Sequence, residues 1–268
     1  MPDIFLLFSL ILFGLIFGSF ISAWSYRLIR NESIFNGRSF CDNCKKKIHW
    51  YDNIPVVSFY LLKGKSRCCK KTISIRYPII EFFTMLTFLF TGISYLNCAF
   101  GNAPICVSRS LFGWFSIPYL LIISVFLITI FVTDFERKII LDELIFIPYV
   151  FALMFLVFIN PDYLYTNIFM SFACATVFLL IHLATRGKGM GLGDVKFVIL
   201  PPIILGWPYT LIWLFLSFVV GAFVGVVLIF FRKARFGKQI PFGPFLILSY
   251  FLTLFLGDKL LFLFQFPY

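Results

Sequence analysis

Long apolar runs separated by short polar segments make up most of this sequence. A helix needs about 20 mostly apolar residues to cross the hydrocarbon core of a bilayer, and most of the runs approach that length. We expect eight spans, over residues 4–26, 79–97, 112–133, 139–159, 164–184, 195–205, 207–231 and a last one that opens at 240–245. The pattern therefore predicts an all-α fold, that of a polytopic integral membrane protein.

The sixth run is short and contains Pro201 and Pro202. Proline removes a backbone donor and clashes with the preceding turn, so this span must kink or break. Broken spans occur in membranes where they face protein or a water-filled cavity. Pairs of glycines four residues apart predict close helix packing in the first and seventh spans, with substrate docking as the alternative for the pair in the first span. These pairs are Gly14 with Gly18 and Gly221 with Gly225.

Composition supports the membrane assignment. Of the 268 residues, 61% are hydrophobic and 13% are charged, whereas a soluble domain is about half apolar and a quarter charged. The formal net charge is +11, and all but Arg109 and Lys259 of the 23 lysines and arginines fall on one side of the expected spans. Basic segments face the cytoplasm, so both termini are expected outside. Membrane orientation explains the charge better than nucleic acid does, and the lipid bilayer is the expected partner.

The pattern divides the chain into three parts. Residues 1–26 form the first span, which has no basic residue before its apolar run. We therefore interpret it as a retained span rather than a cleaved signal peptide. Residues 27–78 form the only polar stretch of any size, here named the cysteine segment, and are expected in the cytoplasm. Residues 79–268 form the membrane core.

The cysteine segment holds four of the seven cysteines of the chain: Cys41, Cys44, Cys68 and Cys69. Cytoplasmic cysteines seldom form disulfides. A Cys-x-x-Cys followed by a second pair is typical of a tetrahedral zinc site, and a metal would supply folding energy to a segment with few apolar residues. We therefore interpret the four cysteines as candidate zinc ligands. Cys98 and Cys106 lie in a short outer loop and pair only if that compartment is oxidising.

Two carboxylates stand at the ends of expected spans. Asp134 closes the third run, and Asp194 follows the glycines of Gly189–Gly193. An ionised carboxylate at the end of a span is costly and is usually functional, and bare glycine backbone allows close approach. Two such groups at one depth can share a proton and activate a water for attack on a peptide bond.

A membrane transporter is the alternative. Intramembrane acids, broken helices and paired glycines also describe ion-coupled carriers that would use the same carboxylates. Internal repeats would favour a carrier, and the sequence shows none.

Several motifs follow one another along nearly the whole chain. The most specific is Gly189-Met190-Gly191-Leu192-Gly193-Asp194-Val195-Lys196, and the others are Gly18-Ser19-Phe20, Tyr26-Arg27-Leu28, Cys41-Asp42-Asn43-Cys44, Asp52-Asn53-Ile54-Pro55, Ile73-Ser74-Ile75-Arg76-Tyr77-Pro78 with Glu81, Asp134, and Ile240-Pro241-Phe242-Gly243-Pro244. With this set the sequence resembles the type IV prepilin peptidases, membrane aspartyl proteases with a GxGD motif.

The resemblance implies an aspartic endopeptidase of the bacterial inner (cytoplasmic) membrane, with Asp134 and Asp194 as catalytic residues facing the cytoplasm. Its substrates would be type IV prepilins and pseudopilins, cut after a glycine between a short basic leader and an apolar helix. Members with the cysteine segment also methylate the new N-terminal phenylalanine with S-adenosylmethionine. The sequence has no glycine-rich nucleotide fold to support that cofactor independently, and it identifies no residues that bind it.

The sequence departs from the family at two places. Ser66 stands where the family's second Cys-x-x-Cys begins, and Cys68 is an extra thiol beside Cys69. Either Cys68 supplies the ligand missing at position 66, or His49 or water completes the metal site, or no metal binds. Leu141 replaces a proline before Asp142, which matches a non-catalytic acid of the family. Two further titratable residues are expected to be structural: Glu81 at a helix start and His182 at a helix end.

Overall fold

The computed structural model of the chain describes residues 2–30, 32, 39–41, 43–98, 104–159, 161–231 and 241–264. Within them the regular structure is helical apart from two isolated β-bridges, so the predicted all-α class is confirmed. Two motif residues named above, Asp42 and Ile240, lie outside the described residues, and so do Asn160, where the sequence predicts an outer turn, and the basic segment 232–238. Contacts divide the chain into two compact units, Met1–Leu96 (unit 1) and Asn97–Tyr268 (unit 2).

Six described helices are long and apolar enough to cross a membrane, so the chain is a multi-pass membrane protein. They cover Asp3–Leu28, Arg76–Asn97, Gly113–Arg137, Pro161–Ala184, Tyr209–Phe230 and Gly243–Phe262. The fourth expected span is the 18-residue helix α6 (Asp142–Ile159). The sixth is divided into α8 (Leu192–Phe197) and α9 (Leu200–Leu205), with Pro201 in the first turn of α9. Proline thus breaks this run as predicted.

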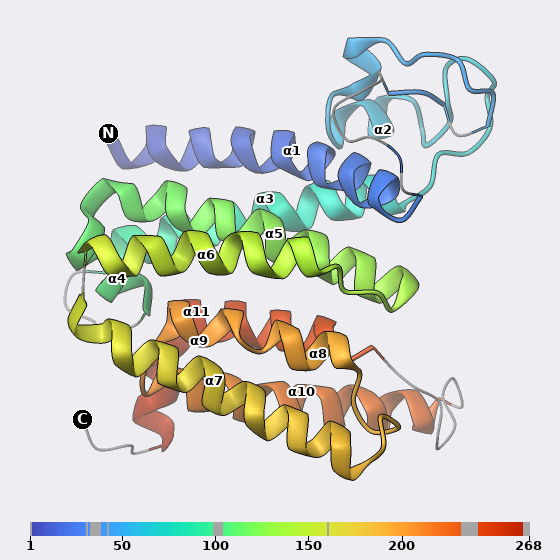
Figure 1. Cartoon of the computed structure of the whole chain (residues 1–268). Coiled ribbons are helices and arrows are strands. Elements are labelled where there is room, and N and C mark those ends of the chain that lie inside the picture. The colour runs from blue at the N-terminus through green and yellow to red at the C-terminus, as the bar shows by residue number, and fades with distance from the viewer. Residues whose placement is uncertain are drawn as a thin grey trace. The chain divides into compact units, whose positions relative to one another are not determined.

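Unit 1 is built on the crossing of α1 (Pro2–Leu28) and α3 (Arg76–Asn97) (Figure 1). A Cβ atom at Gly14 would lie 2.6 Å from the Cα of Met85, and one at Gly18 would lie 2.6 Å from the Cα of Glu81. The first predicted glycine face is therefore confirmed. Between these helices the chain forms the 3-10 turn η1 (Trp50–Asn53) and the short helix α2 (Val57–Leu61).

Unit 2 contains the remaining helices: α4 (Pro104–Phe112), the 3-10 turn η2 (Gly113–Phe115), α5 (Ser116–Arg137), α6, α7 (Pro161–Ala184), α8, α9, α10 (Tyr209–Phe230) and α11 (Gly243–Phe264). α10 and α11 pack together, and the buried indole of Trp213 donates to the carbonyl of Leu246 at 2.8 Å. A Cβ atom at Gly221 would lie 3.1 Å from Phe242, whereas one at Gly225 would meet no described atom within 4 Å. The second predicted glycine face therefore packs at Gly221 alone.

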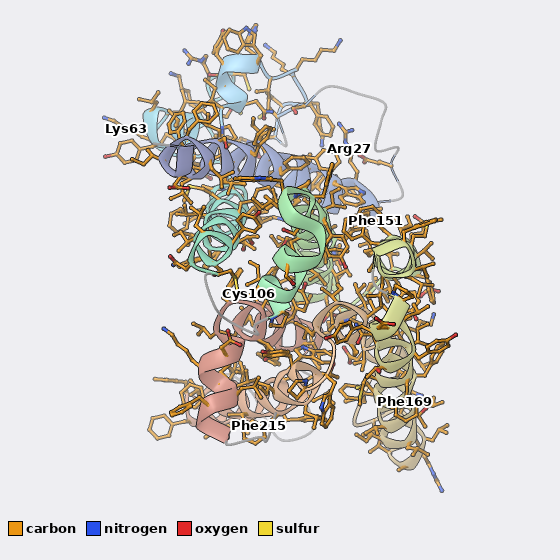
Figure 2. All side chains as sticks on the ribbon, turned by 90° about the vertical axis from the view of Figure 1, so that its left-hand side faces the viewer. Arg27, Lys63, Cys106, Phe151, Phe169 and Phe215 are labelled. Carbon is orange, nitrogen blue, oxygen red and sulfur yellow. A yellow bond between two sulfur atoms is a disulfide. The ribbon has the colours of Figure 1, made fainter. Side chains whose placement is uncertain are left out.

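Apolar side chains cover much of the outside of unit 2. Phe169 on α7 and Phe215 on α10 are 67% and 50% exposed and point away from their helices (Figure 2). Such a surface is costly in water, and in a membrane protein it is the surface that lipid covers.

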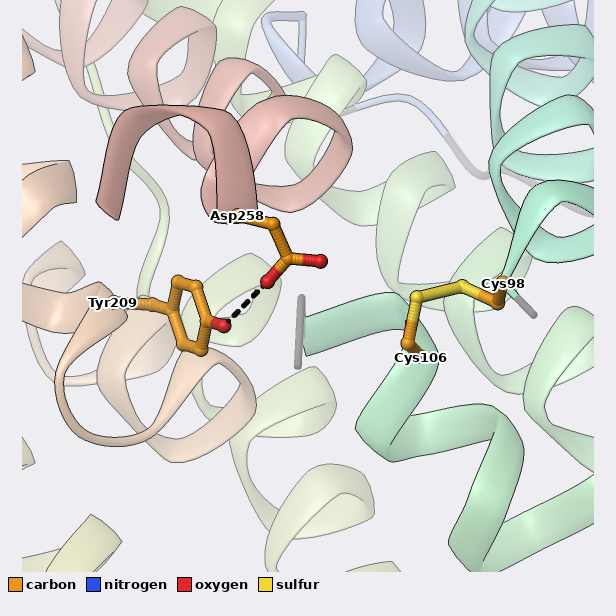
Figure 3. Close-up of a disulfide and its surroundings, with 4 residues drawn as sticks. All are labelled: Cys98, Cys106, Tyr209 and Asp258. Carbon is orange, nitrogen blue, oxygen red and sulfur yellow. Dashed lines mark hydrogen bonds between the residues drawn. A yellow bond between two sulfur atoms is a disulfide. The ribbon is translucent and has the colours of Figure 1, made fainter. Parts of the chain in front are cut away.

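The chain at the start of unit 2 is closed by a disulfide between Cys98 and Cys106, the pairing that the sequence left open (Figure 3). In the same unit Tyr209 of α10 donates to a carboxylate oxygen of Asp258 in α11 at 2.8 Å. Disulfides persist in oxidising compartments, so whether this one persists depends on the side of the membrane that Cys98 and Cys106 face.

Candidate functional site

Asp134 lies in the last turn of α5, where the helix is stopped by Lys138 in a left-handed conformation. Its side chain is 4% exposed. Its Oδ2 atom has no hydrogen-bond partner among the described residues. A Cβ atom at Gly243, the first residue of α11, would lie 2.6 Å from that oxygen. The carboxyl thus faces bare backbone and has an unused acceptor.

Asp194 lies in the first turn of α8 and is 8% exposed. A Cβ atom at Gly191 would lie 3.3 Å from its Oδ2 atom. Burial, and then the negative charge of Asp134, raise the pKa of the Asp194 carboxyl to about 7, although the backbone of Gly191 donates to it and opposes the shift. Asp134 and Asp194 therefore lie close enough to interact through their charges, and we name them the aspartate pair.

Ile140 fills the space beside both glycine positions. Cβ atoms at Gly193 and Gly243 would lie 3.2 Å and 3.4 Å from atoms of its side chain. One aliphatic side chain thus lies against the backbone at the starts of α8 and α11, next to the end of α5. Nothing in the sequence singles out Ile140, because its role depends on three segments that are far apart in the chain.

Two further contacts hold the glycine-rich turn before α8. The ammonium of Lys196 pairs with both carboxylate oxygens of Asp142, at the start of α6, at 2.8 Å. The Nδ1 atom of His182, in α7, lies 2.7 Å from the carbonyl of Met190. A carbonyl only accepts, so this ring nitrogen carries the proton. His182 is therefore a helix-end residue as expected, and it also anchors the turn that leads to Asp194.

In unit 1, the four cysteine sulfurs lie within 4.8 Å of one another. Sulfur ligands about 2.3 Å from a zinc ion lie roughly 3.8 Å apart in a tetrahedron. The Cys41 and Cys69 sulfurs are 3.8 Å apart, and those of Cys44 and Cys68 are 3.0 Å apart. The donor set therefore fits a zinc ion, and its role as a zinc site stays a prediction.

The two halves of this cluster are turns with the same hydrogen bonds. The N–H of Cys41 donates to the carbonyl of Lys46, and the N–H of Ser66 donates to that of Lys71. The carbonyls of Cys41 and Ser66 accept from the residues four positions later, Lys45 and Lys70, which both have positive φ. Cys41 thus corresponds to Ser66, and Cys44 to Cys69. Cys68 corresponds to Asn43, so the first turn has no thiol at that position.

Ser66 is buried in the middle of the sulfur cluster. Its Oγ lies 3.0 Å from the sulfur of Cys68, 3.3 Å from that of Cys69 and 3.5 Å from that of Cys41. Burial alone would raise the pKa of Cys41, but hydrogen bonds from Ser66 and from the backbone of Cys44 and Asn43 lower it to about 6. The thiolate form, which binds metals, is favoured. Metal ligation therefore suits this thiol.

Comparison with protein families gives two matches. The model described as "Bacterial Peptidase A24 N-terminal domain" matches residues 12–95, and that of the "Type IV leader peptidase family" matches residues 121–226. The first match lies within unit 1 and contains the cysteine cluster. The second lies within unit 2 and contains the aspartate pair. No solved structure matches the chain.

Curated relatives match the chain over almost its full length. Proteins named prepilin leader peptidase/N-methyltransferase are 30% identical in Aeromonas hydrophila, over 95% of this chain and 92% of the relative, and 29% identical in Pseudomonas aeruginosa, over 93% and 90%. A relative of the same name from Bacillus subtilis is 29% identical over 94% of this chain and 95% of its own length. Together with the family matches, these identities show that the chain belongs to the type IV leader peptidase family.

Proposed function

We propose that this chain is a membrane aspartyl endopeptidase that removes the leader peptides of type IV prepilins and pseudopilins, with Asp134 and Asp194 as its catalytic residues. One observation carries the proposal. Two buried carboxyls from different helices lie against the bare backbone of Gly191 and Gly243, on either side of Ile140, and an oxygen of Asp134 has no hydrogen-bond partner among the described residues. The names of the relatives, which are leader peptidases, support the same chemistry.

Two nearby negative charges oppose double ionisation, so the aspartate pair holds one proton near neutral pH. The ionised carboxylate takes a proton from water as the water oxygen attacks the scissile carbonyl carbon. The protonated carboxyl donates to the carbonyl oxygen in that step, and a proton is then delivered to the leaving amine. Which aspartate plays which part is a property of the coupled pair. The absence of side chains at Gly191 and Gly243 lets both carboxyls lie directly against the main chain.

The bacterial inner membrane, with the aspartate pair toward the cytoplasm, is the location that the charge pattern favours. Arg137 and Lys138 follow Asp134 within four residues, and Arg186 and Lys188 precede Asp194. Basic residues next to spans face the cytoplasm. A prepilin leader is itself short and cytoplasmic, so cleavage there requires no transport of the leader across the bilayer.

Replacing either aspartate by asparagine tests the proposal. Asp134→Asn and Asp194→Asn keep the size of the side chain but remove proton exchange, so each should lower leader cleavage by about 10³-fold or more. The double variant should be no worse than either single one, because the pair acts as a unit. Cleavage of a purified prepilin in detergent, followed by mass spectrometry, measures the effect.

Asp142→Asn is the matched control. Asp142 makes an exposed ion pair with Lys196, which contributes only about 0–1 kcal/mol, so most cleavage should remain. Cleavage by Asp194→Asn at the parent rate would exclude the proposal. A pH-dependent solute flux in vesicles that is lost in the aspartate variants would then favour the transporter.

We also propose a structural zinc ion bound by Cys41, Cys44, Cys68 and Cys69. The clustering of the four sulfurs supports it, and Cys68 then supplies the ligand that Ser66 cannot. The metal would tie together the two turns of the cysteine segment, in which few apolar residues are buried.

A second activity, N-methylation of the newly exposed residue with S-adenosylmethionine, is proposed from the names of the relatives, all of which include N-methyltransferase. Incubation of the purified chain with a prepilin and S-adenosylmethionine labelled in its methyl group tests both activities together.

A further inference from the structure

Unit 1 contains a cavity of about 700 Å³ whose lining residues all belong to that unit. Its walls come from the second half of α1 between Ile16 and Arg27, from the cysteine segment, and from the start of α3 as far as Glu81. Small-molecule sites typically enclose about 300–1,000 Å³. The cavity is therefore large enough for a cofactor-sized ligand.

The walls combine three kinds of group. Aromatic rings come from several elements, among them Phe20, Phe40 and Phe59, while Lys46 and Lys47 supply positive charge. Aromatic faces attract organic cations, and ammonium groups attract carboxylates. This set suits a ligand that carries an amino-acid carboxylate, a cationic centre and a flat ring. S-adenosylmethionine has all three.

Two carboxylates also line the cavity, and their surroundings differ. Asp52 is held by Arg67, which donates to both of its oxygens at 2.9–3.0 Å. Glu81 is 7% exposed and has no ion-pair partner in the part of the chain that the structure describes. Its Oε2 accepts the N–H of Val56 at 2.8 Å, and the Ser19 hydroxyl donates to it. A carboxylate has about four acceptor positions, so acceptors remain for a ligand.

The backbone around Glu81 is held in an unusual geometry. The N–H of Val56 donates to Glu81. Val56 has φ +58° and ψ −48°, a backbone conformation that is rare for a β-branched residue. Strained backbone persists where the surrounding structure fixes it and is common at ligand sites. Gly18 brings α1 against the backbone of Glu81. The carboxylate is thus fixed at the crossing of two membrane helices, at the end of α3 that joins the cysteine segment.

We propose that this cavity is the methyl-transfer site, that it binds S-adenosylmethionine, and that Glu81 accepts a proton from the α-ammonium of the cleaved pilin. The inference rests on the second activity proposed above. The cleaved pilin starts with an apolar helix, so its new N-terminus lies at the membrane surface. α1 ends and α3 begins at that surface. A protonated amine has no lone pair, so the proton must leave before methylation.

Methyl transfer is a single nucleophilic displacement at the methyl carbon. The ammonium gives a proton to the Glu81 carboxylate, and the amine lone pair attacks the methyl carbon of S-adenosylmethionine. The bond between that carbon and sulfur breaks, and its electron pair stays on sulfur as the neutral thioether of S-adenosylhomocysteine. The product is a secondary ammonium, and Glu81 returns its proton to water.

The test uses the purified full chain, S-adenosylmethionine and a synthetic peptide that begins with phenylalanine, so methylation is measured without cleavage. Ser58→Trp places an indole in the cavity from α2, and Tyr60→Trp is its control, because Tyr60 lies on the same helix, is 83% exposed and does not line the cavity. In equilibrium dialysis, Ser58→Trp should lower binding of labelled S-adenosylmethionine by about tenfold or more, and Tyr60→Trp should bind as the parent does. If Ser58→Trp binds S-adenosylmethionine as the parent does, this cavity is not the binding site.

Glu81→Gln distinguishes a role of Glu81 in proton transfer from a purely structural role. Glutamine still accepts the N–H of Val56 but cannot take a proton, so S-adenosylmethionine should still bind. Near pH 6.5 methylation should fall by about tenfold or more. Near pH 9 it should approach the parent rate, since an α-amino group with a pKa of about 7.7–8.0 is already neutral there.

An equal deficit at both pH values would assign Glu81 a structural role and overturn its proton transfer. A parent chain that cleaves prepilin but neither binds S-adenosylmethionine nor methylates the peptide would overturn this inference but not the proposed peptidase activity. A parent chain that methylates the peptide without cleaving prepilin would overturn the peptidase activity but not this inference.

Discussion

The carboxylates buried in the two units have different surroundings. Glu81 in unit 1 receives the N–H of Val56 at 2.8 Å and lines a large cavity. Asp134 in unit 2 has an oxygen with no partner among the described residues, and it lies against the bare backbone of Gly243. The two carboxylates therefore differ in what surrounds them: Glu81 adjoins open space, and Asp134 adjoins the main chain. We accordingly propose a ligand-binding role for Glu81 and a proton-exchange role for the aspartate pair.

The units also differ in what keeps their polar segments in place. In unit 1, two hydrogen-bonded turns bring four sulfurs together in a segment with few buried apolar residues. In unit 2, the turn before Asp194 is held by His182 and Lys196 and packs on Ile140. We expect the first arrangement to depend on the proposed zinc ion, whereas the second rests on packing and hydrogen bonds. Chelation should therefore affect unit 1 much more than unit 2.

After the aspartate substitutions themselves, the largest effect is expected from crowding the Asp134 carboxyl. Gly243→Ala puts a methyl group where only 2.6 Å separates it from Oδ2 of Asp134. Displacing a catalytic group by about 1 Å can cost about a hundredfold in rate, so leader cleavage should fall by that factor. Zinc content should not change. Kinetics with a prepilin and metal analysis of the same sample measure both.

Two further alanine variants serve as comparisons for Gly243→Ala. Gly225→Ala meets no described atom within 4 Å and should cleave at the parent rate. Gly18→Ala crowds the Cα of Glu81 in unit 1 and should lower methylation more than cleavage. Equal losses of both activities in Gly243→Ala and Gly18→Ala would contradict the separation of the units.

The pH dependence of cleavage should follow the aspartate pair. The pKa of Asp194 is raised to about 7, so its carboxyl keeps a proton below that pH and loses it above. Once both carboxyls are ionised the general acid is gone, and kcat/KM should fall by about tenfold for each pH unit above 7. A profile that stays flat to about pH 9 would show that the pair does not share a proton there.

A smaller change is expected from restoring the second cysteine pair in unit 1. Ser66→Cys puts a thiol at the position that corresponds to Cys41, so zinc affinity should rise by a factor on the order of ten. Cys68→Ser should weaken binding in the parent but have little effect in the Ser66→Cys background. Competition with a chromogenic chelator measures both constants. If Cys68→Ser leaves the parent's affinity unchanged, Cys68 is not a ligand.

The sequence alone determined the all-α membrane class, the break before Pro201, the close packing at Gly14 and Gly18, and the family. These follow from local rules: run length, proline stereochemistry, glycine spacing and the order of motifs. The sequence also named Asp134 and Asp194 as partners from their positions at span ends. It also expected packing at Gly225, where the described residues place no atom within 4 Å of an added Cβ.

Only the tertiary structure decided which atoms meet. That Ile140 lies beside Gly193 and Gly243, that His182 binds the Met190 carbonyl, and that Glu81 lines a cavity depend on helix crossings between distant segments. The pairing of Cys98 with Cys106 and the central position of Ser66 among three sulfurs were likewise left open by the sequence. Local propensity fixes where a helix begins and ends, but the contacts of its side chains depend on the angle and register at which it packs.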